Sequence, residues 1–228
     1  MEQVGFLGSF DKKDLLIDIG KVLTGLGQKV LVVDATLMQR LKYIVPNVSN
    51  NRTITYISEY QGVDVALGFM NLPGIAQYLG TNQIPYDFVL IDTDNVQTMN
   101  SFMIPRLRTN FFVTSYDQYE ISRAIECFQY FNQPMEVIKV VFSADNTTEQ
   151  AEYLANLMEK TPVKLKTAEV HFADTIEDRK ATLENQLMKE IKLKRYTNSY
   201  KDSLEYFVAL VAENIVNQAD IKKIIKKL

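Results

Sequence analysis

Residues 29–34, KVLVVD, and residues 88–92, FVLID, are two short apolar runs that each end in an aspartate, Asp34 and Asp92. Neither run alternates apolar with polar residues, which is typical of central parallel strands that are covered on both faces. Further runs give strand signals, of which the last two are weaker: Val4–Leu7, Asn110–Thr114, Val137–Phe142, Val63–Leu67 and Thr53–Ile57.

Longer segments with helical periodicity lie between these runs. The first places Leu15, Ile19 and Leu23 on one stripe that can dock on a sheet. Because strands alternate with helices and no repeat or linker interrupts them, residues 1–217 are expected to form one α/β domain, a doubly wound, mostly parallel sheet flanked by helices. The other helices are expected at residues 121–131, Thr148–Glu159, Glu177–Ile191 and Ser199–Asn217.

The composition excludes several classes of protein. The chain has 228 residues, with 25 Lys and Arg against 28 Asp and Glu, and a formal charge of −3. One cysteine, Cys127, and one histidine, His171, cannot supply an internal disulfide, a zinc cluster or several Cys/His pairs, so no metal site is expected. The N-terminus lacks a basic region followed by an apolar stretch, and no run approaches the ~18 apolar residues of a spanning helix. These features predict a cytoplasmic protein.

The order of motifs carries a family resemblance. Ligands of open parallel sheets bind beyond the carboxyl ends of the strands, and here a strand, a loop with a lysine and a helix are followed by VLVVDAT (30–36) and YDFVLIDTD (86–94). This order resembles the ParA/MinD family of deviant Walker A ATPases, which are SIMIBI-class P-loop NTPases. Later segments resemble the family as well, so the resemblance runs from about residue 3 to 217. These later segments are FFVTSYDQYEISRA, VIKVVFSAD and AEVHFADTIEDRKATLENQ.

The phosphate-binding loop departs from the family pattern. The family's G-K-G-G-x-G-K-T falls on residues 6–13, FLGSFDKK, so only Gly8 and Lys12 are retained. Asp11 replaces a glycine, and at an effective dielectric near 20 two like charges ~4 Å apart repel by ~4 kcal/mol. Lys13 stands where the Mg²⁺-holding threonine belongs, and Leu7 replaces the signature lysine. The resemblance therefore implies a degenerate P-loop.

Five residues form the expected remnant of the nucleotide site: Gly8, Lys12, Lys13, Asp34 and Asp92. By the resemblance, Asp34 matches the first aspartate of the family's DxD motif and Asp92 matches the Walker B aspartate. The other interpretation is that these aspartates cap helices or lie in solvent. No catalytic residue is assigned and no cofactor is expected, ATP being the one candidate.

The leading hypothesis is a pseudo-ATPase that acts as a scaffold or positioning protein, in localisation, partition, or secretion and pilus assembly. The alternative is an ATP-binding switch with weak or metal-independent ATPase activity, in which Lys13 supplies the charge of the metal. Other proteins are the expected partners, including a second copy. The homodimer is expected to be independent of nucleotide, because Phe6, Leu7 and Phe10 would place apolar groups on the face where nucleotide usually lies.

Residues 218–228 form a basic amphipathic tail. In a helix, one face carries Ile221, Ile224, Ile225 and Leu228, and the other carries Lys222, Lys223, Lys226 and Lys227. The tail is similar to the membrane-targeting helix of MinD-type proteins, which implies a reversible contact with the inner face of the membrane or with a partner. Alternatively, its isoleucines pack on the body. Without the tail lysines the charge is −7, so nucleic acid is an unlikely partner.

Overall fold

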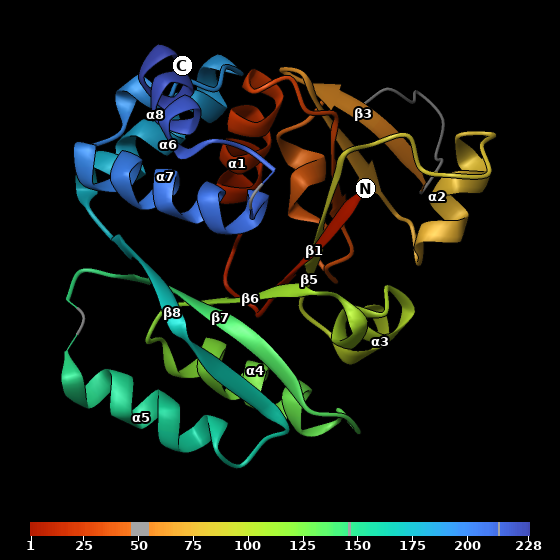
Figure 1. Ribbon diagram of the computed structural model, residues 1–228. Coiled ribbons are helices and arrows are strands. Elements are labelled where there is room, and N and C mark those ends of the chain that lie inside the picture. The colour runs from red at the N-terminus through yellow and green to blue at the C-terminus, as the bar shows by residue number, and fades with distance from the viewer. Residues whose placement is uncertain (47–54, 146, 214) are drawn as a thin grey trace.

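The computed structural model describes residues 1–46, 55–145, 147–213 and 215–228. In that part of the chain eight strands form one sheet in the order β3-β4-β2-β5-β1-β6-β7-β8 (Figure 1). Every neighbouring pair is parallel except β3–β4, which is antiparallel. The strands are β1 (Glu2–Leu7), β2 (Val30–Asp34), β3 (Tyr56–Tyr60), β4 (Val63–Leu67), β5 (Phe88–Thr93), β6 (Thr109–Thr114), β7 (Met135–Ser143) and β8 (Val163–Ala173).

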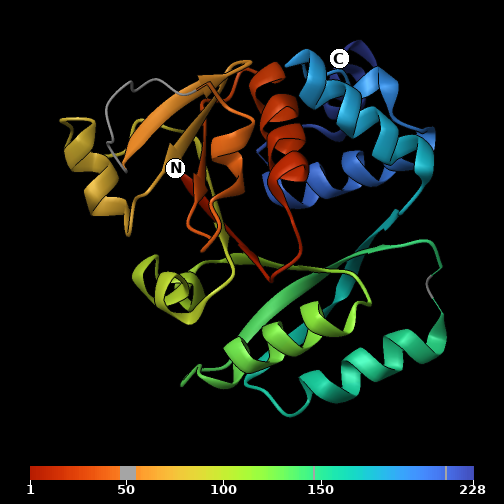
Figure 2. The same cartoon turned by 180° about the vertical axis from the view of Figure 1, so that it is seen from behind.

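Helices cover both faces of the sheet, as Figures 1 and 2 show from opposite sides. Each face has its own buried apolar cluster, and alternate residues of a central strand enter different clusters: Val30 and Val32 one, Leu31 and Val33 the other. The first cluster is completed by α1 (Lys13–Gly25), α6 (Ile176–Met188), α7 (Asn198–Ala212) and α8 (Gln218–Lys227). The second is completed by α2 (Leu72–Tyr78), α3 (Val96–Ser101), α4 (Gln118–Gln129) and α5 (Thr148–Met158).

Several helices begin at a residue whose side-chain oxygen accepts a hydrogen bond from a backbone N–H of the first turn. Asp117, Thr175, Thr197 and Asn217 do so for α4, α6, α7 and α8. Thr147 forms a complete capping box at the start of α5. Helix α1 differs, because its N-cap is Lys12 and has no side-chain cap. The loop before α1 is therefore held by other contacts.

The predicted doubly wound α/β architecture is confirmed. The predicted strands match β1, β2, β4, β5, β6 and β7 within three residues at each end. Residues 53 and 54 of the weak strand signal lie outside the described residues, and β3 begins at Tyr56. The helix expected at Ser199–Asn217 ends earlier, at Ala212, and a separate α8 follows.

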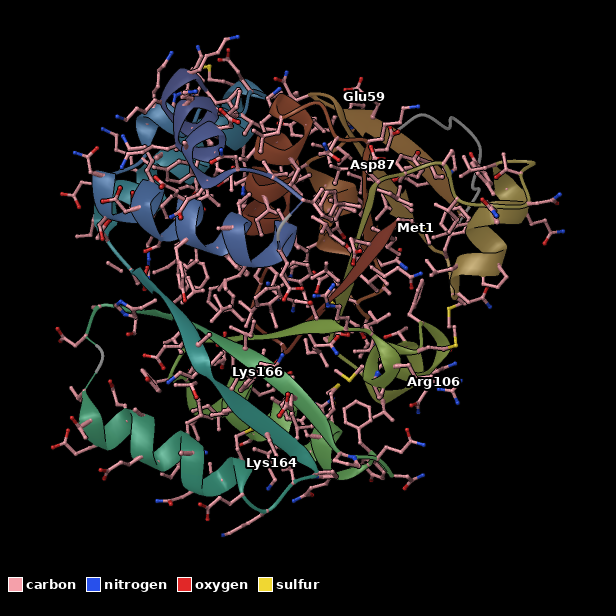
Figure 3. All side chains as sticks on the ribbon, in the orientation of Figure 1. Met1, Glu59, Asp87, Arg106, Lys164 and Lys166 are labelled. Atoms are coloured by element: carbon pink, nitrogen blue, oxygen red, sulfur yellow. The ribbon has the colours of Figure 1, made fainter. Side chains whose placement is uncertain are left out.

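Three elements were not predicted: α2, α3 and β8. The two helices have only seven and six residues, too short for a clear periodicity. Strand β8 is an edge strand whose first half is mostly exposed. Its lysines Lys164 and Lys166 are labelled in Figure 3, as is Glu59 on β3 at the opposite edge. Charged side chains on edge strands disfavour pairing with other chains.

Candidate functional site: a closed phosphate-binding loop

The carboxyl ends of β1, β5 and β2 lie side by side, and the chain crosses to the other side of β1 when it passes from β5 to β6. This is the topological switch point, where open α/β sheets bind ligands. Asp92 on β5 is in register with Phe6 on β1 and Asp34 on β2. The sheet therefore brings together all five predicted remnant residues, which line one cavity.

This cavity is small. Its lining consists of the loop 8–13 with Asp34, Thr36, Met38, Arg40, Asp92 and Asp94, and its volume is about 40 Å³. Pockets that bind drug-sized ligands have volumes of ~300–1,000 Å³. The cavity is therefore far smaller than such pockets in this conformation.

Lys12 is buried at the start of α1, against its own loop. Its side chain is 1% exposed, and Nζ lies 3.0 Å from Asp92 Oδ1. The same ammonium donates hydrogen bonds to the carbonyl oxygens of Gly8 and Phe10, the second at 3.0 Å. Two of its three N–H donors are thus used within the loop, and the contact with Asp92 is an ion pair. Lys12 is therefore bound to its own loop and to the end of β5.

Asp92 is buried together with Lys12. Desolvation raises the pKa of Asp92 to about 7, although the nearby Lys12 acts to lower it. Among the described residues, Asp92 Oδ1 has no hydrogen-bond partner that meets the usual geometry, so the ammonium of Lys12 is its compensating group. Removing that ammonium would leave a buried carboxylate unpaired, which is costly.

Gly8 has a structural reason to be glycine. Its φ is +116°, a region that L side chains rarely adopt, and an added Cβ would lie 2.4 Å from the carbonyl oxygen of Val113 on β6. Both retained P-loop residues thus have roles in packing. Their presence does not require a phosphate.

Asp11 and Lys13 form a small network beside the cavity. Lys13 Nζ lies 2.6 Å from Asp11 Oδ2 and 3.1 Å from Asp14 Oδ2, and Arg40 lies 3.0 Å from Asp11 Oδ2. Burial acts to raise the pKa of Asp11, but Lys13 and Arg40 outweigh it, and the pKa is lowered. Burial acts to lower the pKa of Lys13, but Asp14 and Asp11 outweigh it, and the pKa is raised. Each of these charges has an opposite charge beside it.

Asp34 caps the segment that follows β2. Its Oδ1 accepts hydrogen bonds from Thr36 N and Thr36 Oγ1, at 3.1 and 2.6 Å, and its Oδ2 accepts one from Leu41 N at 3.0 Å. Burial raises the pKa of Asp34. The capping interpretation of this aspartate agrees with these contacts. No group of three or more His, Cys, Asp or Glu side chains in the described ranges is arranged to hold a metal ion.

The prediction that Phe6, Leu7 and Phe10 form an apolar face for a dimer is wrong. Phe6 and Leu7 are fully buried, one in each core cluster, because both belong to β1 rather than to the loop. Phe10 is partly buried and stacks on Phe142, with 4.6 Å between ring centroids. These three side chains stabilise the fold.

The tail folds as α8 and packs on the body, the second of the two arrangements expected. Ile221 and Ile225 are buried in the core cluster with α1 and α7, while Ile224 and Leu228 are partly buried. Lys222, Lys223, Lys226 and Lys227 are exposed. The apolar face is therefore not available to a membrane in this arrangement. None of the helices in the described ranges is long and apolar enough to cross a membrane.

Two parts of the site were not found from the sequence. Arg40, from the short 3-10 helix Arg40–Tyr43, completes the pairing of Asp11. Exposed apolar side chains also surround the site, on α6 and on the segment after β2: Leu37, Met38, Tyr43, Ile176, Leu183 and Leu187. A sequence pattern does not distinguish these leucines from core leucines, because the spacing along the helix is the same for both.

The sheet order, the crossing at β1 and the loop between β1 and α1 define the α/β fold of the ParA/MinD-type P-loop NTPases. A ParA family ATPase from Chlorobium tepidum TLS superposes with a TM-score of 0.62 at 13% identity, covering 91% of this chain and 97% of that one. The MinD cell division protein of Aquifex aeolicus superposes with a TM-score of 0.57 at 12% identity, covering 94% of this chain and 97% of that one. An ATP complex of a McdA variant from Cyanothece superposes with a TM-score of 0.57 at 11% identity, covering 95% of this chain and 99% of that one.

No protein-family model and no curated protein matches the sequence. The likeness to the ParA, MinD and McdA structures is one of fold, at 11–13% identity.

Proposed function

We propose that the protein is a pseudo-ATPase with the ParA/MinD fold, which acts as a scaffold or positioning protein through contacts with other proteins. The observation that carries the proposal is the buried ion pair between Lys12 and Asp92, at 3.0 Å in a cavity of about 40 Å³. In a working P-loop the corresponding lysine reaches the β- and γ-phosphates. Here the ammonium contacts Asp92 and the carbonyl oxygens of its own loop, which supports the proposal.

The energetic consequence supports the proposal. To reach a phosphate, Lys12 would have to leave Asp92 and the carbonyls of Gly8 and Phe10. Breaking a buried ion pair by removing one partner costs ~3–5 kcal/mol, which corresponds to a loss of affinity of ~100-fold or more. Asp11 adds a negative charge beside the loop, and Lys13 offers no hydroxyl for Mg²⁺.

Titration calorimetry with Mg-ATP tests this proposal directly. We expect no saturable heat in the micromolar range, and the same result with Lys12→Ala as a matched control. Saturable binding of Mg-ATP that Lys12→Ala abolishes would contradict the proposal, because it would show that the lysine is free to hold phosphate.

The second candidate is an ATP-binding switch with weak or metal-independent ATPase activity. One observation favours it: two cations, Lys13 and Arg40, line the same cavity as Lys12. Both are paired with aspartates, however. The McdA structure of the same fold is an ATP complex, so the fold itself is compatible with nucleotide.

The proposal makes other proteins the partners, and a role in localisation, partition, or secretion and pilus assembly follows from the family resemblance. A cytoplasmic location, contact with the membrane and the expectation that nucleic acid is an unlikely partner stay predictions. Because the isoleucines of α8 are buried, any membrane contact would use its lysines. A mobility shift with duplex DNA that falls with added salt would contradict the last of these predictions.

A further inference from the structure

A small cavity lies where α8 packs on the first half of α7 and on the short 3-10 helix Leu193–Arg195 (Figure 1). Its volume is about 160 Å³, and it shares no lining residue with the cavity beside the loop 8–13. Most of its lining side chains are charged: Lys194, Lys201, Asp202, Glu205, Lys222 and Lys226. The C-terminal helices thus enclose a polar site that is separate from that loop.

The charged groups around this cavity are mostly unpaired. In the described part of the chain they make one ion pair, with 3.9 Å between Nζ of Lys222 and Oε2 of Glu205. The ammonium groups of Lys194, Lys201 and Lys226 have no ion pair or hydrogen bond with a described residue. An unpaired ammonium keeps its three N–H donors for a ligand.

The lysines of the loop 8–13 differ in this respect. Lys12 and Lys13 each lie within 3.0 Å of an aspartate oxygen, so their charges are already compensated. Three uncompensated ammonium groups around one concave space create a positive potential there, which raises the local concentration of anions. The cavity between α7 and α8 is therefore arranged to hold an anion.

The beginning of α7 adds to this potential. Asn198, the first residue of the helix, also lines the cavity. The N–H groups of a first turn carry a partial positive charge and favour anions. The side chain of Thr197 accepts a hydrogen bond from the N–H of Tyr200, and the N–H of Asn198 has no described partner. The helix and the lysines thus act in the same direction.

Charge and size restrict the ligand. The four ammonium groups and two carboxylates of the lining leave a net charge of +2. A phosphate monoester carries about −1.5 to −2 at pH 7, so one such group neutralises the cavity. The volume of about 160 Å³ is below the ~300–1,000 Å³ of pockets for drug-sized ligands, which favours a compact molecule.

The two carboxylates determine what else the ligand carries. Asp202 and Glu205 are three residues apart on α7 and therefore share one face of the helix. They would repel an anionic group that lay against them, but a carboxylate readily accepts hydrogen bonds from hydroxyl groups. A molecule with a phosphate at one end and hydroxyl groups at the other places each part beside matching groups of the cavity.

We propose that the cavity between α7 and α8 binds a phosphate monoester that carries hydroxyl groups, which is the chemistry of a sugar or polyol phosphate. The phosphate lies among Lys194, Lys201 and Lys226, and the hydroxyl groups donate to Asp202 and Glu205. Because these lysines come from the 3-10 helix, α7 and α8, the ligand holds α8 on the body. A soluble sugar phosphate and the headgroup of a phosphorylated inositol lipid share this chemistry.

Titration calorimetry of the full chain at low salt, with glucose-6-phosphate as the probe, measures the binding. We expect saturable binding of glucose-6-phosphate, weaker binding of inorganic phosphate and none of glucose. Bound ligand should also raise the melting temperature of the protein. No saturable binding of glucose-6-phosphate, or equal binding of glucose, would overturn the inference.

Lysine variants locate the site. Lys201→Gln and Lys226→Gln should each weaken the binding of glucose-6-phosphate about tenfold, the loss of one charge-assisted hydrogen bond. Lys223→Gln is the matched control, because Lys223 is on α8 but pairs with Asp220 at 3.1 Å and does not line the cavity. It should leave the affinity unchanged. Equal weakening by all three changes would show a general attraction to positive charge and contradict a built site.

Sedimentation with phosphatidylcholine vesicles that contain phosphatidylinositol 4-phosphate separates the two sources of ligand. Binding of glucose-6-phosphate without binding of the vesicles assigns a soluble ligand. Vesicle binding that glucose-6-phosphate displaces and Lys201→Gln weakens assigns the lipid headgroup. The inference goes beyond the scaffold role and is independent of it, because the probes contain no nucleotide and the cavity shares no residue with the loop 8–13.

Discussion

The Nζ atom of Lys12 lies 3.0 Å from Oδ1 of Asp92, and both side chains are buried where β1 and β5 end. This contact joins the two positions that match the motif lysine and the Walker B aspartate of the resembled family. The two charges neutralise each other in a buried place, so removing either one should lower the stability of the fold.

Lys12→Met should lower the free energy of unfolding by ~3–5 kcal/mol, because it leaves Asp92 buried without its counter-charge. The double change Lys12→Met and Asp92→Leu should recover most of this loss. Urea unfolding of the three proteins measures the coupling. Lys13→Met, at a more exposed lysine, should cost less. Equal stability of wild type and Lys12→Met would show that the pair is unimportant.

Asp18 should make the protein less stable at neutral pH than at mildly acidic pH. It is buried against Tyr200, whose hydroxyl donates a hydrogen bond to Asp18 Oδ2 at 2.8 Å. Desolvation raises the pKa of Asp18 to about 8 from an ordinary value of 3.8. Between these two pKa values Asp18 is protonated in the folded state and ionised in the unfolded state. The free energy of unfolding therefore falls as pH rises from about 4 to about 8.

Asp18→Asn, which mimics the protonated form, should therefore gain stability relative to wild type by up to ~1.4 kcal/mol per pH unit across that window. Chemical unfolding at a series of pH values measures the difference. A difference between the two proteins that is constant with pH would mean that Asp18 is ionised in the folded state.

Restoring motif residues should not restore nucleotide binding. Asp11→Gly with Lys13→Thr removes the charge and supplies the hydroxyl of the family motif, yet Lys12 stays bound to Asp92. Fluorescent ATP titration should give no saturable signal for this variant. If the Asp11→Gly variant binds ATP more strongly than the wild-type protein does, the switch hypothesis is favoured instead.

Helix α8 should contribute to stability through its isoleucines and not through its lysines. Ile221→Ala removes a fully buried side chain and should cost ~2–5 kcal/mol. Changing Lys222, Lys223, Lys226 and Lys227 to Gln should alter stability by much less, because these side chains are exposed. Thermal unfolding checks both. Sedimentation of the lysine variant with anionic vesicles tests whether any membrane contact needs the lysines.

The central strands of the sheet were predicted well because each is a continuous run of buried apolar residues. Apolar runs such as those ending at Asp34 and Asp92 have few alternatives to central parallel strands, and the register places the two aspartates opposite each other. Edge strand β8 was missed because its alternation is broken by the irregularity opposite Val137 and Lys139. A buried strand carries its signal along its whole length, and an edge strand does not.

The candidate site was predicted in its membership but not in its geometry. The five remnant residues do line one cavity, yet a sequence does not reveal whether a lysine at a helix N-terminus points outward to a ligand or inward to Asp92. Likewise, α6 has the spacing of a core-facing helix, and the hydrogen bonds of Asp178 and Asn185 decide which side is buried. Tertiary contacts determine both outcomes.

A crystal structure of the protein grown with magnesium and a non-hydrolysable ATP analogue tests the central claim most directly. The account predicts that Lys12 keeps its contact with Asp92 and that no nucleotide lies in the loop 8–13. Clear density for the triphosphate and its metal at that loop, with Lys12 turned toward the phosphates, would contradict it.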